Sequence, residues 1–465
     1  MFESETYIQR RTLLKKQIPS GVILFLGNEE SAMNYPANTY PFRQDSSFLY
    51  FFGLDVPGLA AVIDCDSGTE VVYGNDITLE DVIWMGFLPS IGDLAQTVGV
   101  KKSAPLARLD EIIASAQGKN RKIHYLPPYR PETLTRLSSL LGKPMPEVKK
   151  GISETLIKAV VAQRSTKSEE EVREIDRALQ VSRQMYRAAM EMARPGIYEH
   201  EIVGAIEGIA LANGCQTAFP TILTINGHVF HNHYHGNRLE KGRLLVIDSG
   251  VSSPAGYASD ITRTIPVSGR FTAKQKDIYN IVLSGQTEAI RMSGPGIKYK
   301  DVHLATARSI AAGLKDLGLM KGDPDEAVAA GAHALFFPHG LGHMLGLDVH
   351  DMEGLGENYV GYDETISRSG QFGLAYLRLA RALQPGFVLT CEPGIYFVPP
   401  LIDQWEKERK FREFINYDRV EAYRDFTGVR IEDNLLIAEQ GNRVLGKPIP
   451  KKASEIEKIM YPAGK

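Results

Sequence analysis

Histidine and carboxylate side chains gather at a few places in this 465-residue sequence, and these residue types suit metal or proton chemistry. The segment FFPHGLGHMLGLDVHD, residues 336–351, holds three of the chain's 11 histidines. Four acidic residues each lie beside a hydrophobic run. They are Asp248, Asp260, Glu392 and Glu432. One such residue alone is most often a strand-end carboxylate that reaches solvent or caps a turn. Four of them, with a glycine-rich loop that holds three histidines, indicate a shared purpose.

A metal centre would account for these residues together. Burying a carboxylate is costly unless a partner compensates its charge. Two divalent cations need about four anionic oxygens for neutrality, and carboxylates can bridge ions roughly 3.5–4 Å apart. One imidazole among oxygen ligands favours Mn, Co, Fe or Zn over metals that prefer thiolates. The pattern therefore predicts a two-metal site, with its imidazole supplied by the loop of residues 336–351.

The elements that must position these residues fall into two parts. In residues 1–150, strands are predicted over 21–27 and within 60–76, a helix over 107–117, and a strand and a helix within 122–146. A linker, KKGIS, follows. Alternating strands and helices predict an α/β domain over residues 1–150.

Residues 151–465 have a different pattern. A capping box of Ser168 and Glu171 begins a helix that Pro195-Gly196 ends, and further helices are predicted over 201–214 and within 273–330. Strand-like runs dominate elsewhere; these are LLVIDSG, SDITRTIPVSG, FVLTCEPGIYF and VRIEDNLLIAEQG. The pattern predicts a second, α+β domain over residues 151–465, with an antiparallel sheet.

Composition excludes several classes of protein. A net charge of −3 gives no basic excess for nucleic-acid binding. The segment MFESETYIQRRTLLKKQ lacks the apolar run of a secretory signal, and no window approaches the roughly 20 apolar residues of a membrane span. The three cysteines are scattered, which argues against a disulfide framework and a thiolate zinc site. We therefore expect a cytoplasmic protein that binds neither nucleic acid nor membrane.

Taken in order, the motifs resemble those of the pita-bread metallopeptidases, and most closely the Xaa-Pro branch of prolidase (Xaa-Pro dipeptidase) and aminopeptidase P. The matching motifs are VIDSG, SDITRT, HGLGHMLGLDVHD, CEPGIY and VRIEDN, and they cover the C-terminal half. YPFRQDSSFLYFFGL and VIWMG resemble that branch's amino-terminal domain. The resemblance implies an α+β chain, with a pita-bread (creatinase/aminopeptidase-like) catalytic domain after an α/β N-terminal domain.

The resemblance also implies a cofactor and its ligands. Two divalent ions would bind, manganese before cobalt, zinc or iron. Their ligands would be Asp248, Asp260, His343, Glu392 and Glu432. Asp260 and Glu432 would bridge the ions, and Glu392 would act as general base for a shared water whose pKa the ions lower.

Further residues receive catalytic roles from the same resemblance. His339 and His350 would line the site and handle substrate and protons, and Arg430 matches a family arginine beside the site. His233, in HYHGN, would stabilise the oxyanion of the scissile carbonyl.

The histidines of HNHYH have an alternative interpretation. On a strand, His231, His233 and His235 would share one face and could form a zinc cluster. The resemblance gives a role to His233 alone and leaves His231 and His235 without one.

Three residues are expected to contact substrate. Arg378, in YLRLARALQPG, matches a prolidase arginine that binds a dipeptide's carboxylate, to which a guanidinium can donate two parallel hydrogen bonds. The alternative is that Arg378 and Arg381 form the polar face of an amphipathic helix. Trp84 matches a tryptophan that enters the pocket from the partner subunit, unless it is an ordinary, partly buried aromatic. Phe219 stands where relatives often carry a tyrosine near the substrate side chain.

The leading hypothesis is a two-metal exopeptidase that hydrolyses the bond before proline in Xaa-Pro dipeptides, as a homodimer acting on proline-containing peptides. Aminopeptidase P activity on longer peptides is the close alternative, because the core motifs do not separate the two. A methionine aminopeptidase would share the five ligands but would not explain the N-terminal domain. A non-catalytic pita-bread protein that binds a peptide or partner is the alternative from another class.

Overall fold

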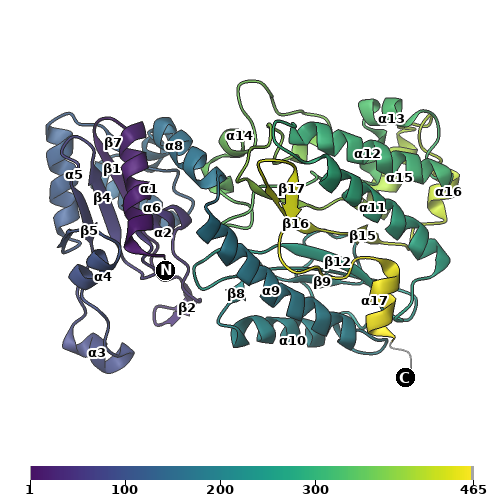
Figure 1. Cartoon of the computed structure of the whole chain (residues 1–465), viewed down its shortest axis with the longest axis horizontal. Helices are drawn as coiled ribbons and strands as arrows, with labels where there is room; N and C mark the ends of the chain where they lie inside the picture. Colours follow the sequence, from purple (N-terminus) through teal and green to yellow (C-terminus); the bar gives the residue numbers. More distant parts are fainter. Residues whose placement is uncertain (1, 462–465) are drawn as a thin grey trace. The chain divides into compact units, whose positions relative to one another are not determined.

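The computed structural model describes residues 2–461 and divides into two compact units (Figure 1). The N-terminal unit comprises residues 1–164 and 354–359, and the C-terminal unit comprises residues 165–353 and 360–465. Among the described residues, no helix combines the length and hydropathy that a membrane-spanning segment needs.

The N-terminal unit is built on a mixed five-stranded sheet in the order β6-β5-β4-β1-β7. Its strands are β1 (Val22–Leu26), β4 (Ala60–Asp64), β5 (Glu70–Tyr73), β6 (Lys102–Ala104) and β7 (Ile123–His124). A hairpin of β2 (Ala32–Tyr35) and β3 (Asn38–Thr39) lies apart from it. The β1–β7 and β5–β6 pairs are parallel and the others are antiparallel. The predicted alternation of strands and helices is confirmed.

Helices accompany this sheet. They are α1 (Ser4–Gln17), α2 (Ser46–Phe52), α3 (Leu79–Met85), α4 (Ile91–Thr97), α5 (Arg108–Gly118), α6 (Pro131–Leu141), α7 (Met145–Lys150) and α8 (Glu154–Ser165). Helices α5 and α6 pack Leu109, Ile113 and Leu137 against Val22 and Val62 of the sheet. The expected KKGIS linker is helical in its first two residues, which end α7.

The C-terminal unit places helices around short antiparallel sheets (Figure 1). Its helices are α9 (Glu169–Met192), α10 (Glu199–Ala212), α11 (Ala273–Met292), α12 (Tyr299–Asp316), α13 (Pro324–Ala330), α15 (Pro399–Lys407), α16 (Tyr417–Glu421) and α17 (Ala453–Met460). Shorter pieces of this unit are η1 (Ala332–Leu335) and η3 (Leu374–Tyr376). Most residues of η2 (Glu353–Leu355) and α14 (Glu357–Val360) fall within 354–359 and are counted with the N-terminal unit.

The strands of this unit pair only with antiparallel neighbours among the described residues. The sheets are β12-β10-β9, β13-β16-β17, β14-β15 and β11-β8. Their strands are β8 (Gln216–Thr217), β9 (Ile222–Thr224), β10 (Leu244–Ser249), β11 (Val251–Ser252), β12 (Ile261–Pro266), β13 (Val388–Cys391), β14 (Gly394–Tyr396), β15 (Gly428–Arg430), β16 (Asp433–Ile437) and β17 (Asn442–Val444). The predicted α+β organisation is confirmed, with the single sheet replaced by several small ones.

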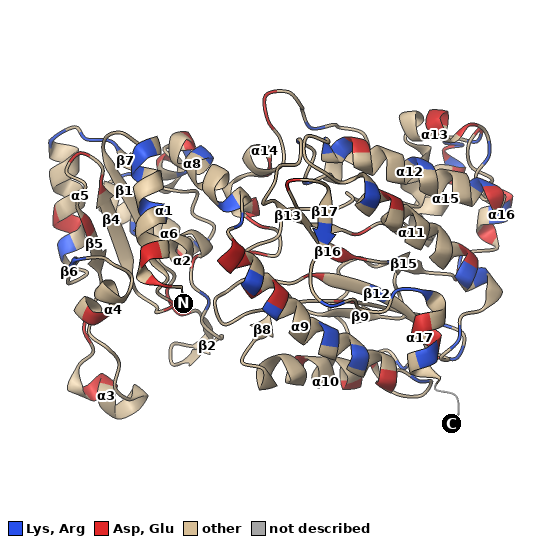
Figure 2. Cartoon of the chain, in the orientation of Figure 1, with Lys and Arg blue, Asp and Glu red and all other residues tan. Residues whose placement is uncertain are grey.

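Helix α9 begins where its sequence predicts. The Ser168 side chain accepts from the Glu171 backbone N–H and the Glu171 side chain accepts from the Ser168 backbone N–H, which forms the expected capping box. Figure 2 shows both acidic and basic residues along α9, and its buried residues include Val172, Ile175 and Met185. The helix therefore packs one apolar face on the strands that carry the carboxylates.

Candidate metal centre and active-site cavity

A cavity of about 770 Å³ lies in the C-terminal unit. Its lining brings together every candidate site residue predicted in residues 165–465: Phe219, His233, Asp248, Asp260, His339, His343, His350, Arg378, Glu392, Arg430 and Glu432. These residues come from segments up to 213 positions apart in sequence, Phe219 and Glu432 being the first and the last. The sites predicted from separate motifs thus meet in one place.

Two aspartates reach the cavity from neighbouring strands. Asp248 is on β10, and Asp260 immediately precedes the antiparallel partner strand β12. The Tyr186 hydroxyl, on α9, donates to the Ile261 carbonyl and accepts from the Ser249 N–H at 3.0 Å. A buried tyrosine thus ties both strands together beside their aspartates.

Hydrogen bonds that involve residues of β12 and β16 hold Glu432 in place. The Thr262 hydroxyl, on β12, donates to Oε2 of Glu432 at 2.8 Å. Asn434 binds the backbone of Asp260 through both its amide oxygen and its amide nitrogen, which fixes β16 against the start of β12. The buried Arg263 donates to the Glu432 carbonyl at 2.6 Å and pairs with Asp433. These contacts direct the Glu432 side chain towards the cavity and the side chain of its neighbour Asp433 away from the cavity.

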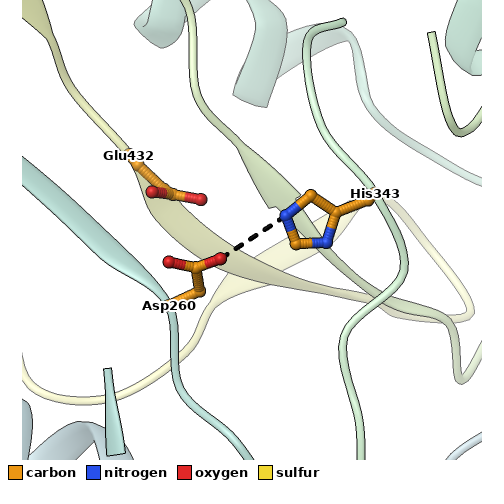
Figure 3. A group of neighbouring side chains, drawn as sticks. All are labelled: Asp260, His343 and Glu432. Atoms are coloured by element: carbon orange, nitrogen blue, oxygen red, sulfur yellow. Dashed lines mark ion pairs between the residues drawn. The ribbon is translucent and has the colours of Figure 1, made fainter. Parts of the chain in front are cut away.

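His343 presents one ring nitrogen to the carboxylates (Figure 3). Its Nδ1 lies 3.0 Å from the Met344 carbonyl, so Nδ1 carries the proton and Nε2 has a lone pair. Nε2 is 3.4 Å from Oδ2 of Asp260 and 3.5 Å from Oε1 of Glu392. One ligand atom each of Asp260, His343 and Glu432 lies within 4.8 Å of the others. A proton on Nδ1 and a lone pair on Nε2 make up the tautomer of His343 that a metal-binding histidine needs.

The carboxylates suit cations, as three buried oxygens indicate. Oδ1 of Asp248, Oδ1 of Asp260 and Oε1 of Glu432 have no hydrogen-bond partner among the described residues. Burial, then repulsion from neighbouring carboxylates, raises the pKa of Asp260 and Glu432 well above its usual range. Burial is also the main cause that raises the pKa of Glu392 to about 7. Buried anionic oxygens that repel one another are stabilised by divalent cations, so this set of residues fits a metal centre.

Arg430 links Asp248 to a second group of side chains. Its Nη2 is 2.5 Å from Oδ2 of Asp248, and its Nη1 donates to the Tyr396 hydroxyl at 2.9 Å. The Tyr396 hydroxyl in turn lies 2.9 Å from Nε2 of His339, whose Nδ1 is 2.8 Å from the Gly340 carbonyl. His339 therefore donates through Nδ1 and accepts from Tyr396 through Nε2.

A third group surrounds His350. Its ring packs edge-on against His343, with the ring centres 4.2 Å apart. Nδ1 of His350 is 2.5 Å from Oε2 of Glu353, and Nε of Arg378 donates to the same oxygen at 3.1 Å. Arg378 lies in an irregular segment after η3, so the alternative that Arg378 and Arg381 form the polar face of an amphipathic helix is wrong.

The histidines at 231–235 do not form a strand. Residues 231–237 are irregular, so the premise that alternate histidines share one strand face is wrong. His231 and His233 both line the cavity, whereas Nδ1 of His235 lies 3.2 Å from the Leu223 carbonyl. The glycine and the two asparagines of HNHYHGN are compatible with this irregular backbone.

Trp84 is on α3, in the N-terminal unit, and is 80% exposed. The alternative interpretation of Trp84, an ordinary partly buried aromatic, is therefore wrong. Four other apolar side chains of the same segment are more than 60% exposed: Leu79, Ile83, Met85 and Phe87. Helix α3 has no buried residue, so it is a surface of unusual apolar character.

Sequence reasoning missed Thr262, Tyr396 and Glu353. Tyr396 and Thr262 both lie within recognised motifs, CEPGIY and SDITRT, but their hydrogen-bond partners come from other strands. Glu353 follows the HD of the histidine loop by two residues, and this proximity was the one available signal.

Comparisons with known proteins agree with this geometry. Residues 173–439 match metallopeptidase family M24, and residues 7–124 match the N-terminal domain of aminopeptidase P. The chain is 30% identical to Xaa-Pro aminopeptidase of Escherichia coli, over 99% of this chain and 98% of the relative. It is also 30% identical to human Xaa-Pro dipeptidase, over 95% and 89%.

Solved structures have the same fold. Aminopeptidase P from E. coli with the inhibitor Pro-Leu superposes with a TM-score of 0.81, at 29% identity, over 99% of this chain and 98% of that one. Aminopeptidase PepP of Pseudomonas aeruginosa has a TM-score of 0.82 at 28% identity, over the same shares. The predicted fold class, a pita-bread domain after an α/β N-terminal domain, is confirmed. The chain therefore belongs to metallopeptidase family M24.

Proposed function

We propose that this protein is a two-metal exopeptidase that hydrolyses the peptide bond before proline. The observation that carries this proposal is the cluster of Asp260, His343 and Glu432, with unpartnered buried oxygens on Asp260 and Glu432. Asp248 and Glu392 complete the proposed ligand set. Manganese is the proposed metal, with cobalt, zinc and iron as alternatives, because imidazole with oxygen ligands suits these ions. When bound, two such ions lower the pKa of water and polarise a carbonyl.

The side chains around this centre have separate proposed roles. Glu392, partly exposed to the cavity, accepts the proton of the attacking water. His233, on the irregular cavity segment, donates to the oxyanion. His350 and His339 line the cavity beside the substrate, and Arg430 holds Asp248 in place through its 2.5 Å contact. Phe219 supplies an apolar surface for the substrate side chain.

We propose that longer Xaa-Pro peptides are the better substrates, as for aminopeptidase P. The names of the bacterial relative and of the solved structures support this choice over the expected dipeptidase. Dipeptide hydrolysis is the second candidate, because Arg378 lines the cavity and could bind a free carboxylate.

The decisive test compares hydrolysis of Ala-Pro and Ala-Pro-Ala after dialysis against a chelator and re-addition of manganese. We expect no cleavage without manganese, and a higher kcat/KM for the tripeptide with it. A preference for Ala-Pro would make the protein a dipeptidase. A protein that cleaves neither peptide with manganese would instead be a peptide-binding or partner-binding member of the fold.

We further propose a homodimer in which Trp84 enters the partner's cavity, because α3 exposes a tryptophan among other apolar side chains. Trp84→Ala is expected to raise KM for Ala-Pro-Ala about fivefold with kcat little changed, since aromatic anchors contribute binding energy. Leu211→Ala, at a position 68% exposed in the C-terminal unit, is the control. Light scattering gives the oligomeric state, and a monomeric wild type would contradict this proposal.

Two further proposals concern the whole chain. The domain boundary expected at residue 150 remains a proposal, with residues 151–465 as the catalytic domain. The cytoplasm is the proposed compartment, in keeping with the three free cysteines.

A further inference from the structure

Glu353 joins two residues of the cavity wall. Its Oε2 is 2.5 Å from Nδ1 of His350 and 3.1 Å from Nε of Arg378. His350 and Arg378 line the cavity, whereas Glu353 is not one of the described residues in its lining. Glu353 therefore contacts both side chains from outside the cavity lining, with its own side chain 38% exposed, and it reaches Arg378 on the edge of the guanidinium that carries Nε.

The Glu353–Arg378 pair carries no net charge. The hydrogen bond with His350, then the charges of His350 and Arg378, lower the pKa of Glu353 to about 2, although burial opposes this shift. A guanidinium is positively charged at every physiological pH. Because the two charges are in direct contact, each weakens the field of the other at a distance of several ångströms. An arginine that would attract anions is thus compensated from within the protein.

This compensation matters for the group that follows proline in a substrate. A dipeptide ends there in a carboxylate, whose desolvation must be offset by a cation. A longer peptide continues with an uncharged amide, which needs no such partner. When its charge is compensated, Arg378 therefore attracts the carboxylate of the dipeptide less strongly. Its interaction with the uncharged amide of a longer peptide does not weaken.

We propose that Glu353 is a specificity-determining residue: its carboxylate compensates Arg378 and so favours the uncharged continuation of a longer Xaa-Pro peptide over the free carboxylate of an Xaa-Pro dipeptide. This inference rests on the proposed function, because it takes Arg378 as the residue that meets the group after proline. It adds a residue that sets the substrate class within that function.

The test uses Ala-Pro and its amide, Ala-Pro-NH2, which differ in charge and hardly in size. With manganese-loaded wild type, kcat/KM is expected to be higher for the amide. Glu353→Gln keeps the side-chain shape and removes the charge, so it is expected to lower the ratio of amide to acid about tenfold, mainly through a smaller KM for Ala-Pro. Glu353→Asp keeps the charge and should keep a ratio above one.

Glu364→Gln is the matched control, because Glu364 is an exposed acid in the loop that precedes Arg378, and its ratio should equal that of wild type. An equal loss of activity on both substrates in Glu353→Gln would mean that Glu353 only holds His350 in place, and would overturn the proposal. A wild type that prefers Ala-Pro to its amide would overturn it without any variant. If manganese-loaded wild type cleaves neither compound nor Ala-Pro-Ala, the proposed function itself fails.

Discussion

Asp260→Asn is expected to lower kcat/KM for Ala-Pro-Ala at least a thousandfold and to remove bound manganese. Asp260 is buried, contributes an unpartnered oxygen and lies 3.4 Å from the imidazole of His343. An amide offers a neutral oxygen, so the site loses one of the negative charges that would hold two cations. A thousandfold loss corresponds to about 4 kcal/mol of transition-state stabilisation. Steady-state kinetics, with metal content measured by mass spectrometry, tests this prediction.

Glu432→Gln should likewise lower kcat/KM and remove bound manganese. The thermal stability of this variant distinguishes metal loss from misfolding. Without metal, burial and neighbouring carboxylates destabilise the charge of Glu432, so the neutral amide should leave the melting temperature of the metal-free protein unchanged or higher. Manganese should then stabilise wild type and not the variant. Glu439→Gln, at an exposed position beyond β16, serves as control. Normal turnover in Asp260→Asn or Glu432→Gln would contradict the metal assignment.

The parts of the fold that could be predicted depend on interactions between residues close in sequence. The capping box of Ser168 and Glu171 lies within one helical turn, so residue types alone locate the start of α9. Each of the four proposed carboxylate ligands likewise lies in its own short motif beside a hydrophobic run, and only the two-residue strand β11 lies between β10 and β12 along the chain. The meeting of Asp248 and Asp260 could therefore be expected from the order of residues alone.

Other features depend on contacts between distant segments, which residue spacing does not encode. Thr262 matters because Arg430, 168 positions away, donates to its hydroxyl at 3.0 Å while that hydroxyl donates to Glu432. Helix α1 is similar: its fully buried Arg11 is satisfied by Glu70 and by backbone carbonyls of distant segments. A charged segment without an apolar face gives no amphipathic signal, although tertiary contacts bury Arg10 and Arg11 together with Tyr7 and Leu14.

Metal removal is expected to lower the melting temperature, and by more at pH 8 than at pH 5.5. In the metal-free protein, burial raises the pKa of Asp260 and Glu432, and that of Glu392 to about 7. These values exceed those of unfolded chains, about 4, so the folded state binds more protons. The stability linked to these protons is fully present below about pH 4 and is lost as pH rises through the folded-state pKa values.

Metal cations replace the protons on these carboxylates, so the metal-loaded protein does not lose stability in this way as pH rises. One pKa unit corresponds to about 1.4 kcal/mol, and each 1 kcal/mol shifts the melting temperature of a domain of this size by roughly 2–4 °C. The difference between manganese-loaded and chelator-treated protein should therefore widen by at least about 5 °C between pH 5.5 and pH 8. Thermal denaturation at several pH values measures this difference, and Glu432→Gln should reduce its widening. A difference that stays constant or narrows with rising pH would show that protons and metal do not compete for these carboxylates.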